Sequence, residues 1–171
     1  QEEFIRAVAG DYPVSVLVMV PPGANPHTYE PTPSQIAQME SANLYLALGS
    51  GIEFENRWLS QIRSMYPNLS IIMTAEQIDL IPADHLHEEH EDPQHHDEQG
   101  MDPHVWLSLE NTARIVNKTA DAMVHERPYM RDVFYANRDR YTSQLFEVDH
   151  TIRSTLKSLQ NRAILVYHPA F

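Results

Sequence analysis

The stretch from Val20 to Gln35 constrains the fold of this chain more than any other segment. An apolar run, V-S-V-L-V-M-V, ends at Val20, and a proline-rich loop that carries His27 follows it. Thr32, Pro33 and Gln35 then show the spacing of a capping box with proline at the first helical position, which predicts the start of a helix. The stretch therefore predicts a strand and a helix joined by a stiff loop, with His27 between them.

Short apolar runs and amphipathic stretches alternate along the rest of the chain. The strand candidates are almost wholly apolar, which is typical of strands buried on both faces of a parallel sheet. The alternation predicts an α/β fold with a parallel sheet flanked by helices. We expect helices at residues 2–9, 33–41, 52–66, 109–125 and 128–159, and strands at residues 14–20, 44–48, 69–73 and 163–167.

The helix expected at residues 128–159 is unusually long. At 1.5 Å per residue it would span about 48 Å, which exceeds the width of a small lobe. We interpret it as a strut that joins two bodies, with the strand at 163–167 as the beginning of the second. Because the chain begins at Gln1 without a methionine and stops at Phe171 directly after that strand, we expect processing or trimming at its start and a further portion after its end.

The composition narrows the classes of function. The chain has 171 residues, no cysteine and a formal net charge of −12. This charge argues against binding to nucleic acid or to anionic membranes and favours the attraction of cations. Any metal would have to be held by histidine, carboxylate, backbone or water. We recognise no signal peptide within the chain, and no apolar run approaches the roughly 18 residues that a membrane span requires.

Three histidines adjoin proline at the expected boundaries of elements. His27 and His168 follow the carboxyl ends of expected strands, where ligands bind in open α/β sheets, and His104 precedes a helix with Ser108 as its N-cap. Neutral imidazole is a common zinc ligand, and three protein ligands plus one further group complete a tetrahedral site. The pattern predicts a three-histidine metal site, although a single loop histidine taken alone is more often an ordinary loop residue than a metal ligand.

Other polar residues near these histidines have two interpretations. Tyr29, Glu30 and Asp102 flank the candidate ligands and are candidates for outer partners that orient the imidazole rings. They are equally consistent with ordinary turn residues. His125 and His150 fall within expected helices, and we interpret them as surface or packing residues.

Residues 84–98 break the alternating pattern. This segment has seven acidic residues, no lysine or arginine, and five histidines, namely His85, His87, His90, His95 and His96. It cannot bury apolar surface, so we expect a mobile loop. It is either a solvated linker or a low-affinity site that gathers divalent cations, and its density of imidazole and carboxylate groups favours the second interpretation.

Several motifs, taken in order, resemble a known family. They are V-P-P-G-A-N-P-H-T-Y-E-P-T-P-S-Q, L-A-L-G-S-G-I-E-F-E, D-P-H-V-W-L-S, A-N-R-D-R-Y and Y-H-P-A-F. Together they cover essentially the whole chain and resemble the metal-ion solute-binding proteins of ABC transporters, in the zinc and manganese branch. The resemblance implies two α/β lobes joined by one long helix. It assigns residues 1–125 to the amino-terminal lobe, whose first strand would precede Gln1, residues 126–160 to the inter-lobe helix, and residues 161–171 to the start of the carboxyl-terminal lobe.

The resemblance also implies a metal site and a function. His27, His104 and His168 would be the family's three histidine ligands, with a fourth group from the second lobe or from water. Residues 84–98 resemble the histidine-rich loop of the zinc members, so Zn²⁺ is expected as cargo, with manganese or iron as the alternative. The implied role is capture of the ion and delivery to a membrane ABC permease, without catalysis. The implied location is a periplasm or the cell surface, with or without a lipid anchor.

Three other functions remain open from the sequence. A zinc hydrolase also uses three histidines and an open position, but no H-E-x-x-H motif or comparable helical pair occurs in the chain. A surface adhesin is the second alternative, and a cytosolic metal store is the third.

Overall fold

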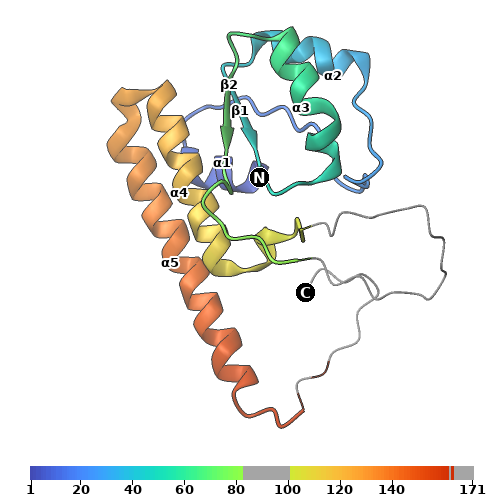
Figure 1. Cartoon of the computed structure of the whole chain (residues 1–171). Helices are drawn as coiled ribbons and strands as arrows, with labels where there is room; N and C mark the ends of the chain where they lie inside the picture. Colours follow the sequence, from blue (N-terminus) through green and yellow to red (C-terminus); the bar gives the residue numbers. More distant parts are fainter. Residues whose placement is uncertain (83–100, 162, 164–171) are drawn as a thin grey trace, which may run out of the picture.

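The structure, a computed structural model, describes residues 1–82, 101–161 and 163. Each expected helix is present within a few residues of its expected bounds, and so are the strands expected at 44–48 and 69–73 (Figure 1). The helices are α1 (Glu2–Ala9), α2 (Pro33–Gln38), α3 (Glu53–Met65), α4 (Leu109–Glu126) and α5 (Arg131–Leu156), and the strands are β1 (Leu44–Ala47) and β2 (Ser70–Met73). Short 3-10 helices follow α2 (η1, Met39–Ser41) and precede α4 (η2, Val105–Leu107) and α5 (η3, Pro128–Met130).

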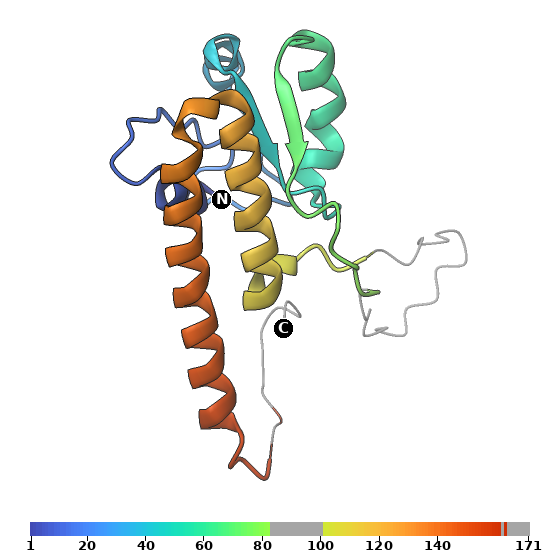
Figure 2. The same cartoon turned by 90° about the vertical axis from the view of Figure 1, so that its left-hand side faces the viewer.

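The two strands form a parallel pair at the centre of the fold. Leu44 lies opposite Ser70 and Ala47 lies opposite Met73, and α3 makes the crossover that parallel strands require. Helices α2 and α3 lie on one side of the pair, whereas α1, α4 and α5 lie on the other (Figures 1 and 2). This arrangement confirms the α/β class and the parallel sheet.

Both faces of β1 are covered by apolar side chains, as the composition of the strand predicts. On the first face, Tyr45 packs in a cluster with Phe54 and Ile62 of α3. On the second face, Leu44 packs in a cluster that joins the buried side chains of α1, α4 and α5, including Phe134. Helix α5 is therefore fixed to the lobe through α1 and α4.

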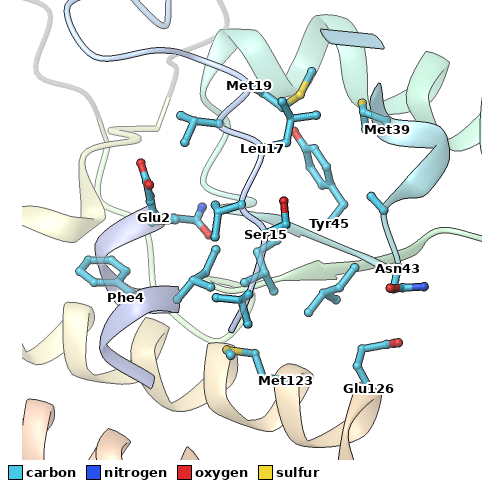
Figure 3. Close-up of a pocket in the computed structure, with 18 of the residues that line it drawn as sticks. Glu2, Phe4, Ser15, Leu17, Met19, Met39, Asn43, Tyr45, Met123 and Glu126 are labelled. Atoms are coloured by element: carbon cyan, nitrogen blue, oxygen red, sulfur yellow. The ribbon is translucent and has the colours of Figure 1, made fainter. Parts of the chain in front are cut away.

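Residues 14–20 do not form the strand that their composition predicts. Within the described residues the sheet has two strands, and a cavity of about 640 Å³ is lined by this segment on one side and by β1 on another (Figure 3). A strand requires a neighbouring backbone to hydrogen-bond with, and the cavity occupies that position. The side-chain amide of Gln35 instead donates to the backbone carbonyls of Val18 and Met19, at 3.4 and 3.1 Å.

Helix α5 is long, as expected, but its 26 residues span about 39 Å instead of about 48 Å. The difference arises because residues 128–130 form η3 and the helix ends at Leu156. Its second half extends past α4 (Figure 2), and the side chains of Phe146, Val148 and Ile152 are 46–53% exposed there. The strand expected at 163–167 lies outside the described residues, apart from Ala163, which is not in a strand.

None of the described helices has an apolar stretch long enough to cross a membrane.

Candidate metal site

The structure brings two of the three predicted ligands together. His27 lies in the loop before α2, and His104 lies immediately before η2, yet their ring centroids are 6.0 Å apart, with the ring planes at 52°. Zinc binds imidazole nitrogen at about 2.0–2.1 Å. The centroids of two rings that share one ion are therefore separated by a distance of the same order as the 6.0 Å between these two rings. The pair therefore has the spacing of two ligands of one metal ion.

Each of the two rings contacts a carboxylate through its Nδ1 atom. Asp102 Oδ1 lies 2.7 Å from Nδ1 of His104 and also accepts the backbone N–H of His104 at 2.9 Å. Glu53 Oε2 lies 2.6 Å from Nδ1 of His27. Carboxylates in this position fix the ring orientation of metal-binding histidines and raise the basicity of the other nitrogen. The arrangement suits metal binding through Nε2 of both rings.

The outer partners predicted from the sequence have different positions. Asp102 lies against the ring of His104, where the sequence places it. The Tyr29 hydroxyl donates to Oε1 of Gln35 at 2.7 Å, and Glu30 is exposed. Glu53 also lies beside His27, a contact that the sequence does not predict because 26 residues separate the two. The signal in the sequence is its place in the motif L-A-L-G-S-G-I-E-F-E, directly after the glycine turn that follows β1.

The turn after β1 connects the two histidine loops. Ser50 is fully buried, and its hydroxyl donates to the carbonyl of Pro103 at 2.8 Å, which ties this turn to the His104 loop. Gly49 has φ of +78°, and an added Cβ would lie 3.0 Å from the side chain of Met73. Glycine is therefore required where the chain turns from β1 toward Glu53 and the His27 contact.

The side chain of Glu55 stabilises the same turn. Its carboxylate accepts the backbone N–H groups of Leu48 and Gly49, at 2.6 and 2.7 Å. Burial raises the pKa of the Glu55 carboxyl above its ordinary value of 4.5, and the two backbone donors partly oppose that rise. The folded state therefore binds this proton more tightly than the unfolded state does, and the stabilising contribution of the group falls as pH rises through the folded pKa.

We expect Glu55→Gln to lower the free energy of unfolding by about 1–3 kcal/mol near neutral pH, because its amide group cannot accept from both backbone donors. The advantage of the wild type over this variant should grow as pH is lowered toward 4.5. Urea denaturation of both proteins at several pH values measures the difference. Glu147→Gln, which replaces an exposed carboxylate of α5, is the control and should show neither effect. A difference that is constant with pH would contradict the raised pKa.

The remaining predicted metal-binding residues lie outside the described part of the chain. These are His168 and the loop histidines His85, His87, His90, His95 and His96. Among the residues that are described, no group of three or more histidine or carboxylate side chains is placed to hold a metal ion. His125 and His150 are exposed on α4 and α5, as expected for surface residues. The third ligand and the auxiliary sites therefore remain predictions.

Comparison with known proteins gives consistent results. The family model described as "ZnuA: Zinc-uptake complex component A periplasmic" matches residues 1–171. The manganese-binding lipoprotein MntA of Halalkalibacterium halodurans is 25% identical over 171 residues, which cover 99% of this chain and 52% of that protein. The high-affinity zinc uptake system protein ZnuA of Bacillus subtilis is 29% identical over 172 residues, which cover 99% of this chain and 53% of that protein.

A solved structure supports the same relationship. The crystal structure of a ZnuA deletion mutant with zinc bound matches with a TM-score of 0.85 at 29% identity, covering 99% of this chain and 60% of that chain. The chain spans about half the length of the curated relatives it matches. The names of these relatives describe binding and uptake proteins and no enzyme. With a family model that matches its whole length, the chain belongs to the zinc-uptake complex component A (ZnuA) family of metal-ion solute-binding proteins.

Proposed function

We propose that this chain is the metal-capturing part of a solute-binding protein and that Zn²⁺ is its cargo. The observation that carries the proposal is the pair of imidazole rings, 6.0 Å apart, from His27 and His104. Each ring has a carboxylate within 2.7 Å of its Nδ1 atom, which is the arrangement that prepares histidine for metal binding through Nε2. The zinc-uptake description of the family supports the same role.

The proposed site has three protein ligands from this chain. His27 and His104 supply two nitrogens, and His168 supplies the third. A fourth group comes from the remainder of the protein or from water, as in other tetrahedral zinc sites. The histidines of residues 84–98 act as a weaker auxiliary site that gathers cations.

Manganese is the second candidate for the cargo, because one relative is named as a manganese-binding lipoprotein. Imidazole nitrogen suits zinc, whereas manganese prefers a larger share of oxygen ligands. The donor set in this chain therefore favours zinc. A competition titration with both ions decides between them.

The proposed arrangement of the whole protein follows from the same family. Residues 1–125 form the amino-terminal lobe, residues 126–160 form the helix that leads to a second lobe, and residues 161–171 begin that lobe. The exposed apolar side chains on the second half of α5 support this division, since they provide a surface for a second body. The loaded protein would then deliver the ion to a membrane ABC permease, from a periplasm or from an anchored position at the cell surface.

We expect Asp102→Asn to weaken zinc binding by about 10–100-fold, the usual effect of losing an outer carboxylate partner. Asparagine keeps the oxygen that accepts the backbone N–H of His104, so the loop retains its shape while the ring loses a charged partner. Calorimetric titration with zinc measures the change. Asp79→Asn, an exposed residue, is the matched control and should bind as the wild type does. Equal affinity in both variants would mean that the charge of Asp102 does not support zinc binding by the His104 ring.

A further inference from the structure

Glu53 belongs to the motif L-A-L-G-S-G-I-E-F-E, but the sequence alone gives it no role at the site. It is the first residue of α3, whereas His27 lies in the loop before α2, and the two side chains meet at 2.6 Å between Oε2 and Nδ1. The side chain of Glu53 is 46% exposed and that of His27 is 31% exposed. The contact is thus made across the structure between two elements, in contrast to that of Asp102 with His104, which are two residues apart in the sequence.

The chemistry of this contact selects one form of the histidine ring. An ionised carboxylate can only accept a hydrogen bond, and a neutral imidazole carries a single N–H group. The 2.6 Å contact is therefore satisfied when the proton lies on Nδ1, which leaves the lone pair of the ring on Nε2. A neutral histidine in water carries its proton mainly on Nε2, so the contact reverses the ordinary preference.

The position of Glu53 is set by the frame of the fold. Two residues further along α3, Glu55 binds the backbone N–H groups of Leu48 and Gly49, which fixes the first turn of α3 to the end of β1. A carboxylate in the first turn of a helix is also favoured by the helix dipole. Glu53 is therefore carried on a rigid element. His27 lies in a loop, where its own backbone N–H donates to the side-chain oxygen of Asn25.

We propose that Glu53 is a positioning residue for metal binding, which holds His27 with its proton on Nδ1 and so directs Nε2 toward the ion. This inference rests on the proposed function, because it assigns the Nε2 atom of His27 to a metal. It adds a residue of α3 to the site. The conformation of the turn after β1, which positions Glu53, therefore influences the tautomer of the His27 ring.

The tautomer of His27 can be measured without any metal. Long-range ¹H–¹⁵N NMR of the metal-free chain at about pH 8, above the ordinary titration range of free imidazole, identifies the protonated nitrogen. We expect the Nδ1–H form for His27 in the wild type and a shift toward the Nε2–H form in Glu53→Ala. Glu53→Gln keeps an oxygen acceptor and should retain much of the Nδ1–H form. Glu40→Ala, an exposed residue after α2, is the control and should leave the spectrum unchanged.

Zinc titration of the same variants completes the test. Glu53→Ala should lose about 10–100-fold in affinity, with a partial recovery in Glu53→Gln. If zinc binding depends on His27 but the tautomer and the affinity are unchanged in Glu53→Ala, the positioning role is overturned while the proposed function stands. If the wild-type protein binds no zinc, or if His27→Ala binds it as well as the wild type does, the proposed function fails and the positioning role fails with it.

Discussion

Replacing His104 with alanine is expected to cause the largest loss of zinc affinity among single changes at the site. The substitution removes a nitrogen that binds the ion directly, so its effect should exceed the roughly 10–100-fold that follows from losing an outer partner such as Asp102. His104 is also the more buried of the two candidate ligands that the structure describes, with 12% of its side chain exposed against 31% for His27. Calorimetric titration with zinc, with manganese as a competitor, measures the change.

His125→Ala is the matched control, because it removes an exposed histidine from α4 and should leave the affinity unchanged. Weak binding that remains in His104→Ala is expected from the histidines of residues 84–98. If tight binding survives in His104→Ala, the histidine-rich segment holds the tight site and the three-histidine assignment is wrong. If manganese displaces zinc, the site stands but its cargo is different.

Phe134→Ala is expected to cause the largest loss of stability, about 3–5 kcal/mol in the free energy of unfolding. Phe134 is 1% exposed and packs in a cluster that includes Val8 of α1 and Ala120 of α4. Its ring also meets that of Tyr12 edge to face, with centroids 5.6 Å apart. Truncation therefore leaves a cavity at the point where α5 is attached to the rest of the lobe. Urea denaturation monitored by circular dichroism measures the loss.

The same helix provides the control for this experiment. Phe146 lies on the second half of α5 and is 53% exposed, so Phe146→Ala should change the stability of this chain by less than about 0.5 kcal/mol. Similar losses in the two variants would mean that the second half of α5 is packed as tightly as the first. A loss below about 1 kcal/mol in Phe134→Ala would mean that the α1, α4 and α5 cluster does not hold the helix.

Local chemistry in the sequence predicts much of the fold. Thr32 accepts the backbone N–H of Gln35, while Oε1 of Gln35 accepts the backbone N–H of Thr32, so the capping box forms as its four-residue spacing indicates. Asp102 lies against His104 for the same reason, because two residues of separation bring a carboxylate to a neighbouring ring. Where the deciding atoms are close in sequence, the prediction and the structure agree.

Two features depend on partners that are distant in sequence, and these could not be predicted. The apolar composition of residues 14–20 predicts a strand, but a strand also requires a neighbouring backbone, and a cavity lies beside the segment among the described residues. Glu53 reaches His27 only because α3 begins at the end of β1, where the turn at Gly49 and Gly51 places it. Composition indicates the chemical and conformational preferences of a residue, whereas the arrangement of helices and strands determines which other residues it contacts.

Among the described residues, helix α5 is packed against the lobe at its amino-terminal end only, so a rotation at that end displaces the other end by a larger distance. Its packed part ends near Leu145, and the 11 residues from there to Leu156 extend for about 16 Å beyond the cluster. A rigid tilt of about 5° at the packed end would move the far tip by about 1.4 Å, which is several times the roughly 0.2 Å tolerance of a metal–ligand distance. A small change in packing around Phe134 would therefore produce a larger displacement of whatever is attached to the far end of the helix.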